Sequence, residues 1–247
     1  MRTYIINLKE STVRKKYMED LLAPLANYLD WEFIEAFDGR NLDKNDIERI
    51  FNQDKAFSTY GRYLKGGEIG CTISHRICYE SIINNNEPYA LILEDDLVWN
   101  RDDIVDVISI AEKILKHNKP IALLLSGDYW YYSKKSITDI YSIASVREAV
   151  CTQAYFINIS AARCLLQKEK YYLADDWYGI SKSGVKLYAM YPHVADQNRR
   201  EFQTEISMEY AGVNRKNMSL FKMIHSYYRA CVKYILLFIG HFEKKNF

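Results

Sequence analysis

The chain has 247 residues, of which 49% are hydrophobic and 26% charged, and its formal net charge is +1. This length and composition predict a globular protein of one large or two small domains, with enough apolar residues for a core. The five cysteines are odd in number, widely spaced and without a C-x-x-C pair, so the sequence suggests neither a disulfide framework nor a zinc site. We therefore expect free thiols in a reducing compartment.

Strand-like and helix-like stretches alternate along the chain, which predicts an α/β sheet rather than separate all-α or all-β parts. The first apolar stretch is interrupted by Lys9-Glu10 too early for a signal peptide, so we do not expect secretion. Ser11 suits the N-cap of the first helix, and Pro88 after three asparagines marks a break before the next strand. The predicted strands cover 3–8, 31–37, 89–94, 121–126, 150–158 and 186–191, and the predicted helices 11–28, 43–52, 67–84, 102–117, 160–168 and the tail.

A cluster of three carboxylates ends the strand predicted at 89–94. The apolar run before it is typical of a strand that is buried on both faces. Three adjacent like charges repel one another, and the usual relief is a bound cation or a set of hydrogen-bond donors. Oxygen ligands of this kind suit Mg²⁺ or Mn²⁺, whereas a solvated acidic turn that caps the next helix explains the pattern equally well. The cluster is Glu94, Asp95 and Asp96.

Other polar residues also fall at the ends of predicted strands. In open α/β sheets, ligands bind at the carboxyl ends of the strands, so we expect these residues to converge on one cleft. They are Asn7, Asp38, the three carboxylates and Gly127-Asp128.

The tail from residue 213 to 247 holds seven Lys or Arg against one acid, so it carries +6 and the remainder −5. Polar and basic residues recur at helical spacing opposite aromatic and aliphatic ones, which predicts a basic amphipathic helix at the surface of an anionic membrane. A last helix packed on the body or on a second subunit is the alternative. We expect no nucleic-acid partner, because the basic residues are confined to the tail. The recurring residues are Lys222, Ser226, Arg229 and Lys233.

Several motifs together resemble glycosyltransferase family 25, which contains bacterial lipopolysaccharide and lipooligosaccharide galactosyltransferases and the procollagen galactosyltransferases. Each motif is weak alone, but they follow the family's order over roughly residues 3 to 207. They are Ile6-Asn7-Leu8 with Ser11 and Arg14, Ala36-Phe37-Asp38-Gly39, 67–75 ending in Ser74-His75, 90–96, 154–160 followed by Ala162 and Leu165-Leu166, Asp175, and Tyr191-Pro192.

The resemblance implies an α/β fold of the GT-A-like (Rossmann-like) type, with a mixed, mostly parallel sheet flanked by helices. The chain has no internal repeat and no low-complexity linker, so the expected partition is one catalytic domain over 1–212 followed by the amphipathic tail of 213–247. The resemblance further implies a UDP-sugar donor, Mn²⁺ or Mg²⁺, and inversion at the anomeric carbon. By analogy with the family's acidic motif, Asp96 is the expected metal ligand, and Glu94 ligates the ion directly or through water, while Asp95 contacts the donor.

The remaining site residues follow from the same resemblance. Arg14 is expected to pair with a phosphate or the uracil edge, and His75 to contact the diphosphate or sugar; a solvated arginine and a buried structural histidine are the alternatives. Asn7, Leu8 and Asp38 are expected to line the nucleoside pocket, although ordinary strand-end turns would use the same residues.

Inversion requires a base that takes the proton of the acceptor hydroxyl. Asp175 is the expected base, but the neighbouring Asp176 departs from the family's single aspartate and competes for the role. His193 is a less favoured candidate for an additional metal ligand.

Three functions remain open. The favoured one is a transferase that moves galactose from UDP-galactose, or else glucose or N-acetylglucosamine, onto a lipopolysaccharide, lipooligosaccharide or other surface-glycan acceptor. It would act in the cytoplasm at the inner face of a bacterial plasma membrane, and a homodimer is compatible with it. The others are a metal-independent glycoside hydrolase that uses Glu94 and Asp175, and a non-catalytic membrane-associated relative.

Overall fold

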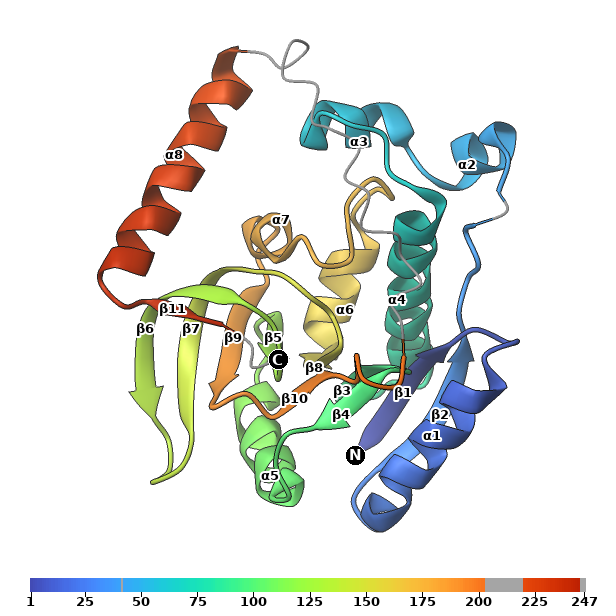
Figure 1. Cartoon of the computed structure of the whole chain (residues 1–247), viewed down its shortest axis with the longest axis vertical. Coiled ribbons are helices and arrows are strands. Elements are labelled where there is room, and N and C mark those ends of the chain that lie inside the picture. The colour runs from blue at the N-terminus through green and yellow to red at the C-terminus, as the bar shows by residue number, and fades with distance from the viewer. Residues whose placement is uncertain (41, 203–219, 245–247) are drawn as a thin grey trace.

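The computed structural model describes residues 1–40, 42–202 and 220–244, without the side chains of residues 220–222. One mixed sheet runs through the molecule, and helices cover both of its faces (Figure 1). Its order is β11 (Phe242–Glu243), β6 (Tyr129–Ser136), β7 (Ser142–Ala149), β9 (Lys186–Tyr191), β5 (Ile121–Leu124), β8 (Ala154–Asn158), β3 (Tyr89–Glu94), β1 (Arg2–Asn7) and β2 (Asp30–Glu35). A separate two-stranded ladder pairs β10 (Ala195–Gln197) with β4 (Leu97–Trp99).

The strand directions confirm the mixed α/β sheet. β1 is parallel to both β2 and β3, and β5 is parallel to β9, whereas β8 lies antiparallel between β3 and β5. Following the ladder across the sheet, β2, β1, β3, β5, β9 and β6 point one way, and β8, β7 and β11 point the other. Most strands of the described chain therefore share one direction, and their carboxyl ends form one edge.

The apolar residues of the central strands alternate between two cores, one on each face of the sheet. Ile92 packs on the face covered by α4 (Gly66–Asn84) and α6 (Ile159–Leu166), as does Tyr4. Ile5 and Leu93 pack on the opposite face, against α1 (Thr12–Leu22) and α5 (Ile104–Leu115). Since successive side chains of a strand point to opposite faces, a continuous apolar run is what a sheet covered on both sides requires.

All six predicted strands form, but the one predicted at 150–158 begins only at Ala154, because residues 150–153 leave the sheet as a loop. Ser11 does precede α1, yet its side chain makes no capping hydrogen bond. The remaining helices are η1 (Ala23–Leu25), α2 (Lys44–Ile50), α3 (Gln53–Tyr60), α7 (Trp177–Lys182) and α8 (Leu220–Phe238); α3, α7, β4, β6, β7, β10 and β11 were not predicted.

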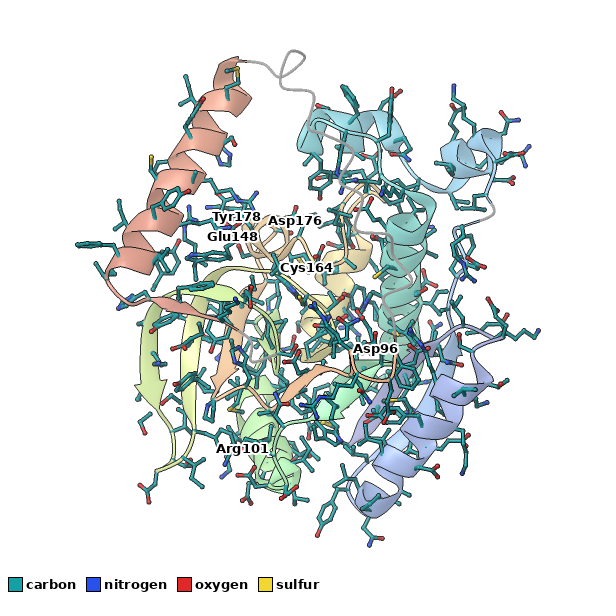
Figure 2. The ribbon with its side chains drawn as sticks, in the orientation of Figure 1. Asp96, Arg101, Glu148, Cys164, Asp176 and Tyr178 are labelled. Atoms are coloured by element: carbon teal, nitrogen blue, oxygen red, sulfur yellow. The ribbon has the colours of Figure 1, made fainter. Side chains whose placement is uncertain are left out.

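The helix predicted in the tail is α8, and two of its basic residues, Arg229 and Lys233, face the body of the protein. Arg229 donates to both carboxylate oxygens of Glu148 on β7, at 2.9 and 2.6 Å, and Lys233 lies 3.3 Å from the same carboxylate. Glu148 lies below α8, beside Tyr178 (Figure 2), whose ring lies 4.2 Å from the Arg229 guanidinium carbon. After α8 the chain continues into β11, which pairs with the outer edge of β6.

The opposite face of α8 leaves large apolar side chains exposed. Phe238 is 90% exposed and Tyr234 72% exposed, whereas Leu236 is buried. Within the described residues, no helix is long and apolar enough to cross a membrane. The other exposed apolar residues of this face are Ile224, Tyr227, Tyr228 and Ile235, and Leu237 and Ile239 are exposed near the end of the helix.

Candidate active site

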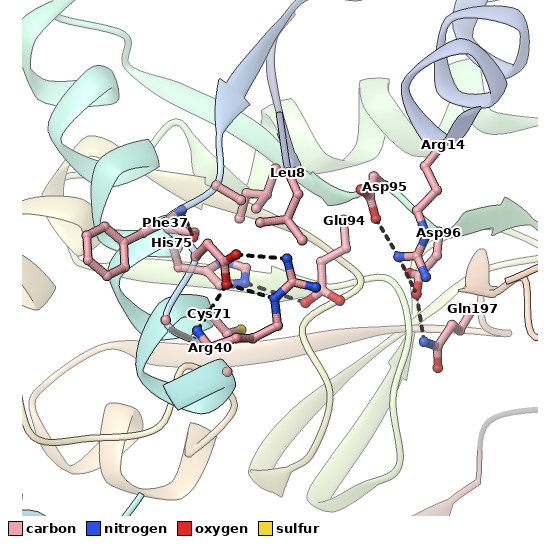
Figure 3. A pocket seen from close by; sticks show the side chains of 16 residues that line it. Leu8, Arg14, Phe37, Arg40, Cys71, His75, Glu94, Asp95, Asp96 and Gln197 are labelled. Carbon is pink, nitrogen blue, oxygen red and sulfur yellow. Dashed lines mark hydrogen bonds and ion pairs between the residues drawn. The ribbon is translucent and has the colours of Figure 1, made fainter. Parts of the chain in front are cut away.

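A pocket opens at the carboxyl ends of β1 and β3, between the first turns of α1 and the N-terminal half of α4 (Figure 3). Its volume is about 160 Å³. Seven of the predicted residues line it, and Asn7 lies directly behind one of them. Asp175, Asp176 and the predicted Gly127-Asp128 turn are not among the lining residues. Those of the predicted set that line it are Leu8, Arg14, Asp38, His75, Glu94, Asp95 and Asp96.

Two close contacts between backbones bring α4 against the segment that follows β2. A Cβ atom on Gly39 would lie 1.9 Å from the carbonyl oxygen of Gly66. A Cβ atom on Gly70 would lie 2.5 Å from the carbonyl oxygen of Phe37. Only glycine permits so close an approach of two backbones. The glycines of both motifs therefore place the next turn of α4, and with it His75, at the wall of the pocket.

Asp95 is held by two donors from the first βα unit. Arg14 donates to its Oδ1 at 2.9 Å, and the Asn7 side chain donates to its Oδ2 at 2.8 Å. Burial raises the pKa of Asp95, while the hydrogen bond from Arg14 acts in the opposite direction. Asp95 thus fixes Arg14 at the rim of the pocket, and its expected contact with the donor stays a prediction.

Asp96 is buried with one of its oxygens unsatisfied. Its Oδ2 accepts a hydrogen bond of 2.7 Å from Gln197 and lies 3.8 Å from Arg14, whereas its Oδ1 has no hydrogen-bond partner among the described residues. Burial and the charge of Glu94 raise the pKa of Asp96 to about 6. Figure 3 shows Arg14 and Gln197 converging on this carboxylate. Gln197 comes from β10 and was missed, because its sequence neighbourhood carries no motif.

Glu94 faces the other wall of the pocket. It accepts a hydrogen bond from the Thr152 hydroxyl, and its Oε1 lies 3.5 Å from Nε2 of His75. Nδ1 of His75 bonds the Tyr155 hydroxyl at 2.8 Å, so the ring is held from behind. Cys71 lies beside this pair, and burial together with the charges of Glu94 and Asp175 raises the pKa of its thiol. Thr152 lies in the loop that had been predicted as strand, which explains why it was missed.

Asp38 is ionised and held in place at the mouth of the pocket. The Arg40 guanidinium donates to both of its oxygens at 2.8 Å, and the Arg40 backbone N–H donates as well. These bonds lower the pKa of Asp38 to about 2. The carboxylate is therefore an acceptor at any physiological pH.

The two neighbouring aspartates of the second half of the chain are in different environments. Asp176 is the N-cap of α7: its side chain accepts from the Gly179 N–H at 3.0 Å and from the Tyr60 hydroxyl at 2.9 Å. Asp175 is more deeply placed, and burial raises its pKa, with further contributions from Asp176 and Glu94. Asp176 is therefore occupied by structural bonds, while Asp175 lies within electrostatic reach of the pocket.

His193 does not line the pocket. Its Nε2 bonds the carbonyl oxygen of Gly127 at 2.8 Å, and its ring packs edge-on against Tyr129. Burial lowers the pKa of this histidine, which keeps it neutral. The metal-ligand role considered for His193 is therefore not supported by its position.

The sequence profile of glycosyltransferase family 25, described as an LPS biosynthesis protein family, matches residues 1–178. The chain belongs to glycosyltransferase family 25. An Aedes aegypti protein named Glycosyltransferase 25 family member is 35% identical over 97 residues, which are 38% of this chain and 16% of that protein. Procollagen galactosyltransferase 1 of Danio rerio is 23% identical over 224 residues, covering 82% of this chain and 35% of that protein. A Haemophilus influenzae protein with a glycosyltransferase name is 24% identical over 172 residues, covering 68% of this chain and 57% of that protein. The chain thus spans less than two thirds of the length of each of these relatives.

The family 25 pocket has the donor chemistry of a hard divalent cation site. Asp96 and Glu94 supply carboxylate oxygens, which suit Mg²⁺ and Mn²⁺. A buried Oδ1 without a partner costs free energy unless a donor or cation meets it, and a bound cation would supply that contact. Arg14 lies closer to Asp95, at 2.9 Å, than to Asp96, at 3.8 Å, so it offsets the charge of Asp95 more than that of Asp96. The residues present therefore fit the expected ion.

Proposed function

We propose that this family 25 member is an inverting, metal-dependent glycosyltransferase that uses UDP-galactose and extends a lipopolysaccharide, lipooligosaccharide or related surface glycan. The observation that carries the proposal is the buried Oδ1 of Asp96, which no group in the described part of the chain meets, in a pocket that also holds Glu94 and Arg14. A cation there would offset the negative charge that develops on the leaving diphosphate. Arg14, which Asp95 holds in place, would offset the same negative charge.

In the proposed arrangement, the nucleoside and the diphosphate of the donor bind at opposite ends of the pocket. Asp38 is a permanently ionised acceptor suited to ribose hydroxyl groups, and the apolar side chains of Leu8 and Phe37 flank it as a surface for a base. Arg14 and the cation site lie at the opposite end, where the phosphates would bind (Figure 3). The sugar would then lie near Glu94 and His75, on the side nearer to Asp175.

Asp175 is the proposed base. Its raised pKa makes it a better proton acceptor than an exposed aspartate, and the backbone N–H of Cys151 holds the carboxylate in place. Asp176 holds α7 and Tyr60, and so supports the position of Asp175. In this arrangement Asp175 takes the acceptor hydroxyl proton as the hydroxyl oxygen attacks the anomeric carbon, and UDP leaves from the opposite face.

A donor panel tests the function directly. Incubation of the protein with UDP-galactose, UDP-glucose and UDP-N-acetylglucosamine in the presence of Mn²⁺ should release UDP slowly, and fastest from UDP-galactose. Addition of a lipooligosaccharide acceptor should raise the rate, and EDTA should stop it. Undiminished turnover in EDTA would refute the metal-dependent mechanism, and cleavage of a glycoside without nucleotide would favour the hydrolase.

We also propose that 213–247 forms a membrane-facing tail on the catalytic domain of 1–212. The exposed aromatic and aliphatic face of α8 suits insertion between lipid headgroups, and a lipid-linked acceptor would be found there. Arg229 and Lys233 share their contacts with the single carboxylate of Glu148 and face the body of the protein, so apolar burial must supply most of the affinity. The Lys222 side chain lies outside the described part of the chain.

Removing the apolar face of α8 should release the protein from liposomes. The triple substitution Tyr234→Ser, Ile235→Ser and Phe238→Ser removes exposed side chains only, so we expect an unchanged melting temperature and at least a tenfold loss of binding to phosphatidylglycerol vesicles in a sedimentation assay. Val13→Ser, at an exposed position on α1, is the matched control. Undiminished sedimentation would refute the membrane role, and a change from dimer to monomer would assign this face to a second copy of the chain.

A further inference from the structure

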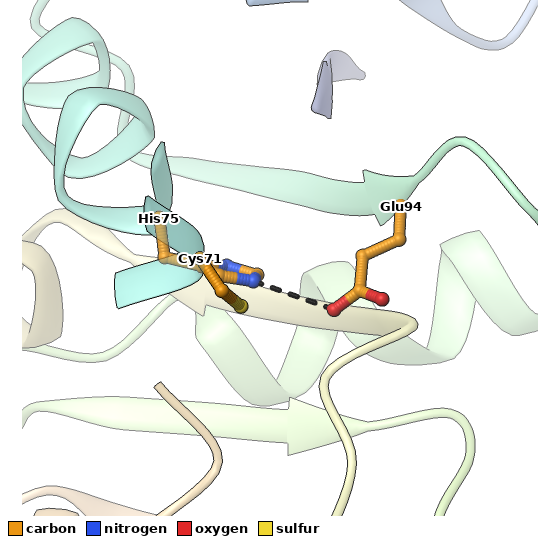
Figure 4. A group of neighbouring side chains, drawn as sticks. All are labelled: Cys71, His75 and Glu94. Atoms are coloured by element: carbon orange, nitrogen blue, oxygen red, sulfur yellow. Dashed lines mark ion pairs between the residues drawn. The ribbon is translucent and has the colours of Figure 1, made fainter. Parts of the chain in front are cut away.

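Three side chains on one wall of the pocket combine sulfur, nitrogen and oxygen donors. Cys71 and His75 are one helical turn apart on α4, and Glu94 reaches them from the end of β3 (Figure 4). One ligand atom from each residue lies within 4.8 Å of the other two. We propose that these residues form a binding site for a thiophilic divalent cation, represented by Zn²⁺, and that its occupation inhibits the transferase.

The orientation of His75 is the observation that points to a ligand. Its ring is 1% exposed, and its Nδ1 bonds the Tyr155 hydroxyl, which in turn bonds the Tyr79 hydroxyl at 2.9 Å. Nε2 is buried, faces Glu94 and has no hydrogen-bond partner among the described residues. Histidines that bind metals are held in the same manner, with the second ring nitrogen bonded to an oxygen outside the site.

The distances suit a small tetrahedral ion. Bond lengths of about 2.3 Å to sulfur and about 2.0–2.2 Å to nitrogen and oxygen place neighbouring ligand atoms roughly 3.3–3.7 Å apart. The 3.5 Å between Nε2 of His75 and Oε1 of Glu94 already lies in this range. Cys71 is on the same face of α4 as His75, and its Sγ lies within 4.8 Å of the other two ligand atoms, so a small adjustment would be needed to bring it to bonding distance. The fourth position would open into the pocket.

The donor set separates this site from that of Asp96. Thiolate and imidazole prefer Zn²⁺ and Co²⁺, whereas carboxylate oxygens alone prefer Mg²⁺ and Mn²⁺. Glu94 stands between the two sites and is the residue that they share. A zinc ion on Cys71 and His75 would engage Glu94, so the cation that accompanies the donor would lose a ligand. The inhibitory part of this inference rests on the proposed function, but the binding part does not.

Cobalt binding tests the site without any nucleotide. When the metal-free full chain is titrated with Co²⁺, we expect a thiolate-to-cobalt charge-transfer band with the visible bands of a tetrahedral ion. Cys71→Ser should abolish the charge-transfer band, and Cys231→Ser, at an exposed cysteine on α8, should leave it unchanged. Tyr155→Phe removes only the hydroxyl that holds the His75 ring, so it should weaken Co²⁺ binding roughly tenfold.

Inhibition is measured separately, as UDP release supported by Mn²⁺ with increasing Zn²⁺. For each protein, the rate of UDP release is expressed relative to its rate without zinc. The Zn²⁺ concentration that halves this relative rate should be about tenfold or more higher in Cys71→Ser than in the wild type. Absence of the charge-transfer band in the wild type, or its persistence in Cys71→Ser, would overturn the cation site. A normal band in a protein that releases no UDP from any donor would leave the cation site standing and refute the proposed transferase.

Discussion

Replacement of Asp96 by asparagine should lower Mn²⁺-dependent release of UDP by at least about 10³-fold. Asparagine keeps the size of the side chain and can retain the contact with Gln197 through its carbonyl oxygen. It removes the negative charge that would hold the cation against the leaving diphosphate. The measurement is the rate at saturating UDP-galactose over a range of Mn²⁺ concentrations, with Asp139→Asn at an exposed position as the control.

The same substitution should make the metal-free protein more stable. The pKa of Asp96 is about 6 in the folded chain, above that of an exposed aspartate, so its ionisation opposes folding at neutral pH. Asp96→Asn should therefore raise the free energy of unfolding by about 1–3 kcal/mol at pH 7.5. This advantage should shrink as the pH falls through 6, because the wild-type carboxylate then becomes neutral. Addition of Mn²⁺ should stabilise the wild type and leave the variant unchanged.

An increase in stability together with a loss of activity would identify Asp96 as a functional residue that the fold tolerates at a cost. Equal activity of Asp96→Asn and wild type in Mn²⁺ would overturn the cation site. A fall in both activity and stability would instead show that Asp96 serves mainly to anchor Gln197 and β10.

The second large effect is expected for Asp175. Asp175→Asn should lower kcat by about 10²–10⁴-fold with little change in the KM for the donor, because the base acts only in the transition state. Asp176→Asn is the matched control: asparagine also caps helices, so α7 and the Tyr60 contact should survive and kcat should change little. Both variants carry the same chemical change at adjacent positions, so the ratio of their rates isolates the role of the base.

The pH dependence should report the same group. Burial, Asp176 and Glu94 raise the pKa of Asp175, so kcat/KM should fall on the acidic side at a pH above the usual range of an aspartate. At saturating Mn²⁺, where the bound cation would keep Asp96 ionised, this acidic limb should be missing from the residual activity of Asp175→Asn. An unchanged limb in that variant, or an equal loss of kcat in Asp176→Asn, would assign the base to another residue.

The fold could be predicted from sequence where the pattern is local. The apolar run before Glu94 required a strand covered on both faces, and that is how β3 is packed. The hairpin of β6 and β7 had no such signal, because the second half of β6 is exposed and polar. Which face of α8 turns toward the body could not be predicted either, because it depends on Glu148, which lies on a strand 81 residues before Arg229.

The candidate site likewise combines residues that belong to sequence motifs with residues that do not. The acidic cluster and the glycines of α4 form motifs, so Asp96 and His75 could be named in advance. Gln197 and Thr152 approach the cluster from segments without a motif, so only the folded chain reveals them. The proposed choice of Asp175 over Asp176 rests on the cap that Asp176 forms on α7, a short helix that the sequence did not predict.

The backbone contact between Gly39 and Gly66 also limits how the specificity of the proposed transferase could be redesigned. Any side chain at Gly39, Gly66 or Gly70 would push α4 away from the segment that follows β2 and widen the whole pocket instead of reshaping one part of it. The wall of the pocket is therefore rigid on this side. Libraries that aim to change the accepted sugar should instead vary Gln197 and Phe37, whose side chains border the pocket without forming that contact.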